Sequence, residues 1–240
     1  SRLSFTESLL ASGALRSSPM TVLDVGAREG AASHWEVYGD QLHLIGFEPD
    51  AEECARLNQP ASRPSGRRET YHPLALYRTQ GIRTLYLTKN GHASSLLQAN
   101  PGFVSRFPQA GPGTVIGTAE VQTTDLDSFA EKHGLSSVDF VKLDVEGAEL
   151  AVLEGAERLL QSGSVLGLYV EVFFQPYHID RPLFGDIDQY LRKRGFALFD
   201  LEPERWVRKT LTTDDPRDWY GAGQLIWANA LYFRDPVVEM

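Results

Sequence analysis

The segment VLDVGAREG, residues 22–30, constrains the fold more than any other part of the chain. Its aliphatic residues predict a buried strand, and Gly26 predicts a sharp turn from that strand into the next element. Such a turn is typical of nucleotide-binding βα units. The dinucleotide fingerprint G-x-G-x-x-G is absent, however, because Arg28 stands where the middle glycine would be. The segment therefore predicts a ligand that approaches the turn without a pyrophosphate.

Strand and helix patterns alternate along most of the chain. The predicted strands are residues 21–26, 42–48, 69–76, 138–144, 165–174, 196–202 and 224–233. The predicted helices are 31–40, 51–58, 125–134, 148–163 and 184–195, after a lead-in helix within residues 1–20. This alternation predicts an α/β fold with a mostly parallel sheet and helices on both faces. The last two strands have no helix between them, which predicts an antiparallel addition at one edge. We expect one domain from residue 21 to residue 240.

Two segments interrupt this pattern. Residues 89–118 are rich in Gly, Pro, Ser and Asn and predict a long loop, between exposed strands at 83–89 and 118–123. Residues 203–222 form a second polar segment, which contains Trp206, Trp219 and Tyr220. Long loops inside a compact domain often carry function. We therefore expect both segments on the substrate side of the molecule.

Composition limits the partners of the protein. Its 240 residues carry a formal charge of −9, which argues against nucleic acid, since phosphate binding requires clustered cations. Cys54 is the sole cysteine, so no internal disulfide can form and a reducing, cytoplasmic location is expected. The longest apolar run, 165–174, is too short to span a membrane and contains Glu171. We expect a small-molecule partner and neither nucleic acid nor membrane.

Four carboxylates stand at or near the ends of predicted strands: Asp24, Glu48, Asp144 and Glu171. Ligands of open parallel sheets bind at the carboxyl ends of the strands, so these side chains should converge on one rim. An acid at a strand end can instead cap the helix that follows it. That explanation suits one acid better than all four.

The position of Glu48 indicates the kind of ligand. It follows Gly26 by 22 residues, the spacing at which an acid meets ribose hydroxyls in nucleotide-binding βαβ units. Asp24 would repel a pyrophosphate but would pair with an ammonium group. S-adenosylmethionine has a ribose, an amino group and a sulfonium, and it has no phosphate. The sequence therefore favours S-adenosylmethionine as the cofactor.

Several blocks, in one order from about residue 20 to 234, resemble the FkbM-type S-adenosylmethionine-dependent methyltransferases. They are DVGAREG, FEPD, PLAL, SSLL, TTDLDSF, VDFVKLDVEGAELAVLEGAERLL, VEVF and GQLIWANALYFR. The block KLDVEGAEL is the most specific. One position departs from the family pattern, since Arg28 stands where family members commonly have Asn or His.

The resemblance implies the Rossmann-like class I methyltransferase fold, with seven strands in the order 3-2-1-4-5-7-6 and the last strand antiparallel. It also implies O-methylation of a hydroxyl on a sugar or natural-product scaffold. An acceptor tethered to a carrier protein stays open.

By position, the resemblance implies that Asp24 and the turn Gly26–Gly30 hold the methionine end of the cofactor. Glu48 would bind the ribose, and Leu74 with Ala75 would pass the adenine. The full set of expected cofactor residues is Asp24, Gly26, Ala27, Arg28, Gly30, Glu48, Pro49, Leu74, Ala75 and Asp144.

The expected reaction is in-line attack of a hydroxyl oxygen on the methyl carbon, helped by a general base. The candidates for that base are Asp144, Glu146, Glu171 and His178, and we favour Asp144 or Glu146. Glu146 could instead cap the following helix. The residues expected near the acceptor are His92, Ser94, Ser95 and Tyr177.

The six histidines show no spacing typical of a metal site, so no metal is expected. Two other functions stay open. An NAD(P)-dependent oxidoreductase could use Arg28 to pair with a 2′-phosphate. A non-catalytic module would bind S-adenosylmethionine without transferring its methyl group.

Overall fold

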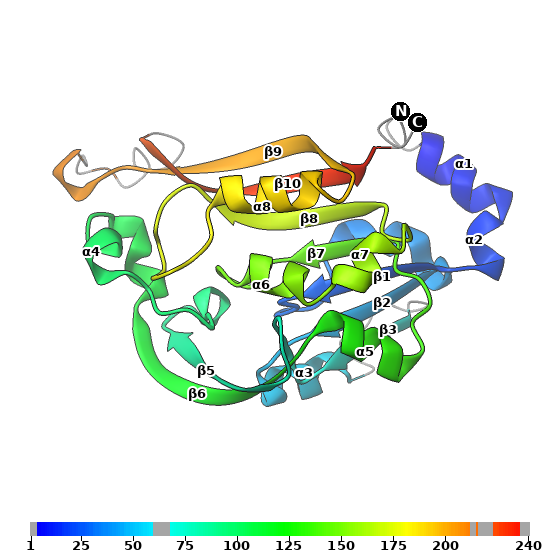
Figure 1. The fold of residues 1–240 in the computed structure, drawn as a ribbon, viewed down its shortest axis with the longest axis horizontal. Helices are drawn as coiled ribbons and strands as arrows, with labels where there is room; N and C mark the ends of the chain where they lie inside the picture. The colour runs from blue at the N-terminus through cyan, green and yellow to red at the C-terminus, as the bar shows by residue number, and fades with distance from the viewer. Residues whose placement is uncertain (1–3, 60–67, 212–214, 216–222, 236–240) are drawn as a thin grey trace.

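The computed structural model describes residues 4–59, 68–211, 215 and 223–235, and its main feature is a seven-stranded sheet (Figure 1). In spatial order the strands are β3 (Arg68–His72), β2 (Leu42–Phe47), β1 (Met20–Val25), β7 (Phe140–Leu143), β8 (Gly167–Phe173), β10 (Gln224–Arg234) and β9 (Phe196–Trp206). Numbered in chain order, these strands follow the expected 3-2-1-4-5-7-6. Strand β10 is antiparallel to both of its neighbours. The expected fold class is confirmed.

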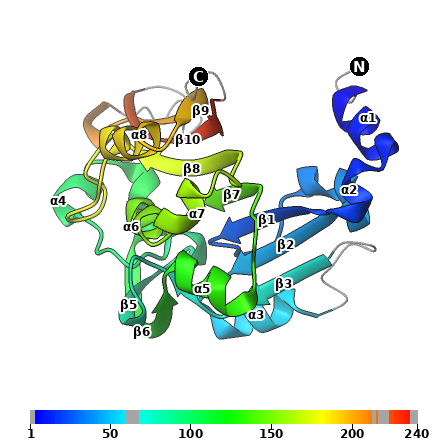
Figure 2. The same ribbon diagram turned by 45° about the vertical axis from the view of Figure 1, so that its right-hand side comes forward.

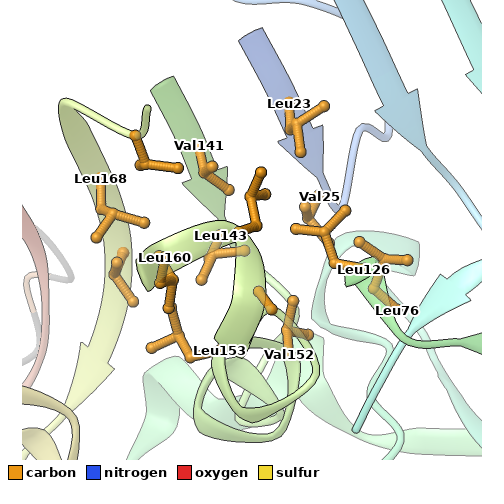
Figure 3. Close-up of a cluster of buried hydrophobic side chains, with 14 of the residues drawn as sticks. Leu23, Val25, Leu76, Leu126, Val141, Leu143, Val152, Leu153, Leu160 and Leu168 are labelled. Atoms are coloured by element: carbon orange, nitrogen blue, oxygen red, sulfur yellow. The ribbon is translucent and has the colours of Figure 1, made fainter. Parts of the chain in front are cut away.

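Helices cover both faces of this sheet. One face carries α5 (Leu126–His133), α6 (Glu149–Glu154), α7 (Glu157–Gln161) and α8 (Phe184–Arg192), and the other carries η1 (Ser33–Gln41) and α3 (Ala51–Leu57). Strand β1 shows the alternation, because Leu23 and Val25 belong to the larger core while Val22 packs with the second. Figure 3 shows Leu23 and Val25 facing Leu126, Val152 and other aliphatic side chains of the larger core.

The lead-in segment forms two short helices rather than one. Helix α1 (Ser4–Ser12) and helix α2 (Ala14–Ser17) are separated by Gly13, whose φ of 74° is left-handed. Figure 2 shows both helices beyond the start of β1, away from the middle of the sheet. The domain boundary at residue 20 stays a prediction. No helix among the described residues is long and apolar enough to cross a membrane.

A second sheet of three strands was not expected. It consists of β4 (Ala75–Leu76), β6 (Val115–Thr124) and β5 (Gly81–Thr88), in that order. The single strand predicted at 69–76 is wrong, because the chain leaves the large sheet after His72 and joins β6 at Ala75. Pro73 has no amide hydrogen, which suits the break between the two sheets.

The segment predicted as a long loop, 89–118, includes short regular elements that the sequence did not predict. It contains η3 (Gly91–Ala93), α4 (Pro101–Val104), η4 (Pro108–Gly113) and the start of β6. Asn100 caps α4 by accepting the amide of Phe103. Phe103 and Phe107 are buried against Phe173 and Tyr177, so apolar contacts hold this segment to the large sheet.

Two predicted helices differ in detail. The helix expected at 31–40 is the 3-10 helix η1, which is kinked at Gly39. The helix expected at 148–163 divides into α6 and α7 at Gly155, where a Cβ would meet the carbonyl oxygen of Tyr77 at 2.5 Å. In the segment 203–222, β9 continues to Trp206 and η5 spans Lys209–Leu211. Trp219 and Tyr220 lie outside the described residues.

Candidate functional site

A cavity of about 650 Å³ lies at the carboxyl ends of the central strands, between the two sheets. Residues that end or follow β1, β2 and β7 line one side of it, and residues of β5 and β6 line the other. This size suits a small-molecule ligand. The position is the one at which open parallel sheets bind ligands.

Most of the predicted site residues meet in this cavity. Its lining includes Gly26, Arg28, Glu48, Pro49, Leu74, Ala75, His92, Ser94, Asp144, Glu146 and Glu171. The structure does not place Asp24, Ala27, Gly30, Ser95, Tyr177 or His178 among the lining residues.

The first turn joins the ends of three strands. The amides of Gly26 and Ala27 both donate to the carbonyl oxygen of Phe47, at 3.1 and 3.0 Å. Gly26 has a φ of 81°, and a Cβ there would overlap the carbonyl oxygen of Asp144. Gly30 also has a left-handed φ, of 88°. The backbone conformation and close packing of the turn therefore require glycine at position 26, whichever ligand binds there.

Lys142, which the sequence analysis did not single out, occupies the space beside this turn. Its Nζ lies 3.1 Å from Oδ1 of Asp24 and 3.5 Å from Oδ2 of Asp144, and it donates to the carbonyl oxygen of Gly26 at 2.8 Å. Burial disfavours the charged form of Lys142, but Asp24 and Asp144 outweigh burial and raise its pKa. The available signal was a lysine in an otherwise apolar strand, two residues before Asp144.

Glu48 directly follows β2 and lies close to Arg28. The Glu48 side chain is almost buried, and burial raises its pKa even though the Asp50 amide and Arg28 act in the opposite direction. Arg28 donates to Oδ2 of Asp50 at 3.2 Å, and its Nη1 lies 4.0 Å from Oε1 of Glu48. Its guanidinium also packs against Gly91, where a Cβ would lie 2.9 Å from Cζ. Arg28 thus connects the β2 end to the η3 segment.

Next to Arg28, a second contact joins the first turn to η3. His92 Nε2 lies 3.0 Å from Oε1 of Glu29, and both side chains are well exposed. Glu29 has a φ of 70°, in the left-handed region. The η3 segment is therefore held to the turn by two neighbouring residues, Arg28 and Glu29.

Three carboxylates converge at the other end of the cavity. Asp144, Glu146 and Glu171 each offer an oxygen, and these oxygens all lie within 4.8 Å of one another. Burial, with Asp144 and Glu149 nearby, raises the pKa of Glu146 to about 8. Burial and the neighbouring carboxylates Glu146 and Asp144 raise the pKa of Glu171 well above its ordinary value.

The loop that presents Glu146 is tightly braced. Glu146 has a left-handed φ of 56°, and its carbonyl oxygen accepts a 2.7 Å hydrogen bond from Ser95 Oγ. Glu149, which is fully buried, accepts the amides of Val145 and Gly147 at 3.1 and 3.0 Å. Ser95 and Glu149 therefore support the loop from behind, and Glu149 lies in the first turn of α6.

His178 and Tyr177 lie behind this loop. Arg181 donates to His178 Nδ1 at 3.1 Å, which places the imidazole proton on Nε2. Burial and the adjacent Arg181 lower the pKa of His178 to about 3. Tyr177 packs against Phe173 and Trp206, and burial raises its pKa. Both side chains are buried outside the cavity, so neither faces a ligand there.

Other lining residues come from strands that the sequence predicted without placing them at a cavity. Leu85 and Val121 extend from the small sheet, and Trp227 extends from β10. With Phe47 and Leu76 they form an apolar wall of the cavity. The sequence shows the alternation of apolar and polar residues in β5 and β6. It does not show which cavity the apolar residues face, because that depends on pairing between distant segments.

Comparison with known proteins gives a family match. The model of the "Methyltransferase FkbM domain" matches residues 24–198. A search of curated proteins found no match. Among solved structures, magnesium protoporphyrin IX methyltransferase from Synechocystis, with bound S-adenosylmethionine, is 13% identical and has a TM-score of 0.44, covering 97% of this chain and 77% of that chain. The StiE O-methyltransferase domain is 11% identical with a TM-score of 0.44, covering 96% and 73%.

A third similar structure is the N-terminal domain of EvdMO1 with S-adenosylhomocysteine bound, which is 11% identical with a TM-score of 0.41 and covers 95% of this chain and 79% of that one. The family assignment rests on the domain match, which spans most of the chain and both acidic ends of the cavity. The chain belongs to the FkbM methyltransferase family, whose cofactor is S-adenosylmethionine.

Proposed function

We propose that this methyltransferase transfers a methyl group to a hydroxyl oxygen of a small molecule, a sugar or a natural-product scaffold, free or tethered to a carrier protein. One observation carries the proposal. A single cavity holds Glu48 beside one strand end and the carboxylates of Asp144, Glu146 and Glu171 beside two others.

The residues of the cavity fit S-adenosylmethionine. Strands β2 and β8 are three positions apart in the sheet, so Glu48 and Glu171 lie roughly 14 Å apart at about 4.8 Å per strand. The sulfonium of S-adenosylmethionine is bonded to C5′ of its ribose, so a ribose bound at Glu48 leaves room for the methyl group and an acceptor before Glu171. The apolar wall that includes Leu74, Leu76 and Phe47 suits an adenine ring.

Each end of the cavity then has a role. Glu48 accepts the ribose hydroxyls, the segment Leu74–Ala75 covers the adenine, and the Gly26 turn with Arg28 receives the methionine end. Asp24 acts through Lys142 rather than by touching the ligand, since Lys142 lies between Asp24 and the cavity. When bound, S-adenosylmethionine supplies an electrophilic methyl group.

The carboxylates after β7 then receive the acceptor proton. Asp144 and Glu146 lie in the cavity on the loop that follows this strand, and we propose that one of them is the general base. A base works best when its pKa lies near the working pH, which the raised pKa of Glu146 approaches. His92 and Ser94 line the cavity as well and are proposed to orient the acceptor.

Calorimetry with S-adenosylmethionine and S-adenosylhomocysteine tests the cofactor site. Both should bind, and Glu48→Ala should abolish binding, while Glu52→Ala on the exposed side of α3 should not. Absence of binding of either ligand would sink the proposal. Transfer of a labelled methyl group is then measured across sugar, natural-product and carrier-tethered hydroxyl acceptors. Binding without transfer to any of them would indicate a binding module instead.

A further inference from the structure

We propose that Asp144, Glu146 and Glu171 bind a divalent cation such as Mg²⁺ at the acceptor end of the cavity. The spacing of the histidines predicted no metal, and that spacing does not reveal carboxylates from separate elements. These three carboxylates come from the loop after β7 and from the interior of β8, and only the fold brings them together. The inference goes beyond the proposed function and concerns how the acceptor is held.

Glu171 carries the inference. Its residue is 7% exposed, and its Oε2 atom has no hydrogen-bond partner among the described residues. It lines the cavity, and a carboxylate oxygen of Glu171 lies within 4.8 Å of oxygens of both Asp144 and Glu146. A buried carboxylate oxygen without a donor, in a side chain close to two other carboxylates, is well suited to a cation from outside the chain.

The nearby basic side chains, Lys142 and Arg181, pair with other groups. Lys142 reaches Asp144 at 3.5 Å but lies closer to Asp24. Arg181 is buried behind the loop, where it lies 3.8 Å from Glu149 and donates to His178. Within the described part of the chain, neither Glu146 nor Glu171 has an ion pair with Lys, Arg or His. Two of the three carboxylates therefore lack a basic partner.

The separations suit a hard cation. Two oxygens on opposite sides of one ion are separated by twice the metal–oxygen distance, which is about 4 Å for Mg²⁺ and about 5 Å for Ca²⁺. The three carboxylate oxygens lie within 4.8 Å of one another, which is inside the span for Ca²⁺, and binding of Mg²⁺ would draw them slightly closer together. Carboxylate ligands with no sulfur and no imidazole favour Mg²⁺, Mn²⁺ or Ca²⁺ over zinc or copper.

A cation here has a consequence for the acceptor. With one oxygen from each carboxylate, an octahedral ion keeps about three further positions for oxygen ligands. Two neighbouring acceptor oxygens, such as a vicinal diol or an α-hydroxy carbonyl, could take two of them. This preference for an acceptor with paired oxygens rests on the proposed hydroxyl methylation, whereas the cation site itself does not.

Titration of the whole chain with Mn²⁺, followed by electron paramagnetic resonance and in competition with Mg²⁺, tests the site. One Mn²⁺ per chain should bind, and Glu171→Gln should weaken its binding at least about tenfold. Glu120→Gln, which removes an exposed acid from another part of the cavity wall, should leave Mn²⁺ binding unchanged. Thermal unfolding with and without Mg²⁺ shows that each variant folds, and the cation should raise the Tm of the parent chain but not of Glu171→Gln.

S-adenosylhomocysteine binding, measured on the same samples, separates the two proposals. Cofactor binding without any Mn²⁺ binding at millimolar concentration would overturn the cation site and leave the methyltransferase proposal intact. Mn²⁺ binding unaffected by Glu171→Gln would also overturn it, since the ion would then lie elsewhere. Mn²⁺ binding that depends on Glu171, in a chain that methylates no hydroxyl, would support the cation site and reject the proposed acceptor class.

Discussion

Lys142 Nζ lies 3.1 Å from Oδ1 of Asp24, and the two residues are partners in the register of strands β7 and β1. The sequence indicated that Asp24 would pair with an ammonium group of the cofactor. In the structure an ammonium group of the protein takes that place. The same lysine donates to the carbonyl oxygen of Gly26, so this pair fixes the turn at the base of the cavity.

Lys142→Met should therefore affect stability and cofactor binding together. The substitution leaves Asp24 almost buried without its cation, which should lower the free energy of unfolding by about 3 kcal/mol. Urea unfolding measures this loss, and calorimetry measures the weaker binding of S-adenosylhomocysteine. The double variant Asp24→Asn, Lys142→Met is the control and should recover part of the stability. A loss below about 0.5 kcal/mol would show that the pair behaves like a surface salt bridge.

Gly26→Ala should disrupt the turn itself. A Cβ at this position would overlap the carbonyl oxygen of Asp144, and the φ of 81° is unfavourable for alanine. We expect a loss of at least about 2 kcal/mol in unfolding free energy and no detectable cofactor binding. Gly185→Ala is a matched control, since a Cβ there meets no atom within 4 Å and Gly185 lies in helix α8. That variant should be neutral or slightly more stable. Equal stabilities for the two variants would contradict the prediction.

The sequence predicted the large sheet because its strands carry their own signals. Strand β8 is a nearly continuous apolar run, and Glu48 and Asp144 follow the apolar ends of β2 and β7, so the convergence of these acids follows from the parallel order. The resemblance to a known family supplied the order of the strands, and the missing helix before the last strand indicated the antiparallel pair at the edge.

The parts that were missed depend on contacts between distant segments. Pro73 is a local sign of a break within residues 69–76, but nothing local indicates that Ala75 then pairs with Thr123. The role of Lys142 likewise depends on its register with Asp24. Glu171 was expected at the rim, but its approach to Glu146 depends on a left-handed residue in a loop, which no periodicity reveals.

Ser95→Ala should loosen that loop. Ser95 Oγ donates to the carbonyl oxygen of Glu146 at 2.7 Å and accepts the amide of Leu97 at 2.9 Å, and the side chain is buried. Removal of the hydroxyl leaves both groups unsatisfied, so unfolding free energy should fall by about 2 kcal/mol. Because Ser95 does not line the cavity, kcat should fall more than cofactor affinity. Ser128→Ala, on the exposed side of α5, should change neither the unfolding free energy nor kcat. An unchanged kcat would show that the backbone holds Glu146 without Ser95.

His178 should make stability depend on pH in a defined direction. Its pKa is lowered from 6.5 to about 3 in the folded chain by burial and Arg181, so the unfolded chain binds a proton below pH 6.5 that the folded chain does not. Stability from this residue is therefore complete above about pH 6.5 and is lost as the pH falls toward 3. The slope is about 1.4 kcal/mol per pH unit, which amounts to about 2 kcal/mol between pH 7.5 and 5.

The difference in stability between the parent chain and His178→Gln isolates this effect. The buried carboxyls Glu149 and Glu171 also make stability depend on pH, in the direction opposite to His178, but they contribute equally to the parent and to the variant. Their raised pKa values mean that the folded chain holds protons which the unfolded chain releases, so they favour folding at low pH. Urea unfolding at pH 7.5 and 5 should show a smaller decrease for His178→Gln than for the parent. Nitrogen NMR of labelled histidine should find the His178 ring neutral at pH 5. A ring that titrates near pH 6.5 would mean that the loop after β8 opens to water and that His178 is free to act on a ligand.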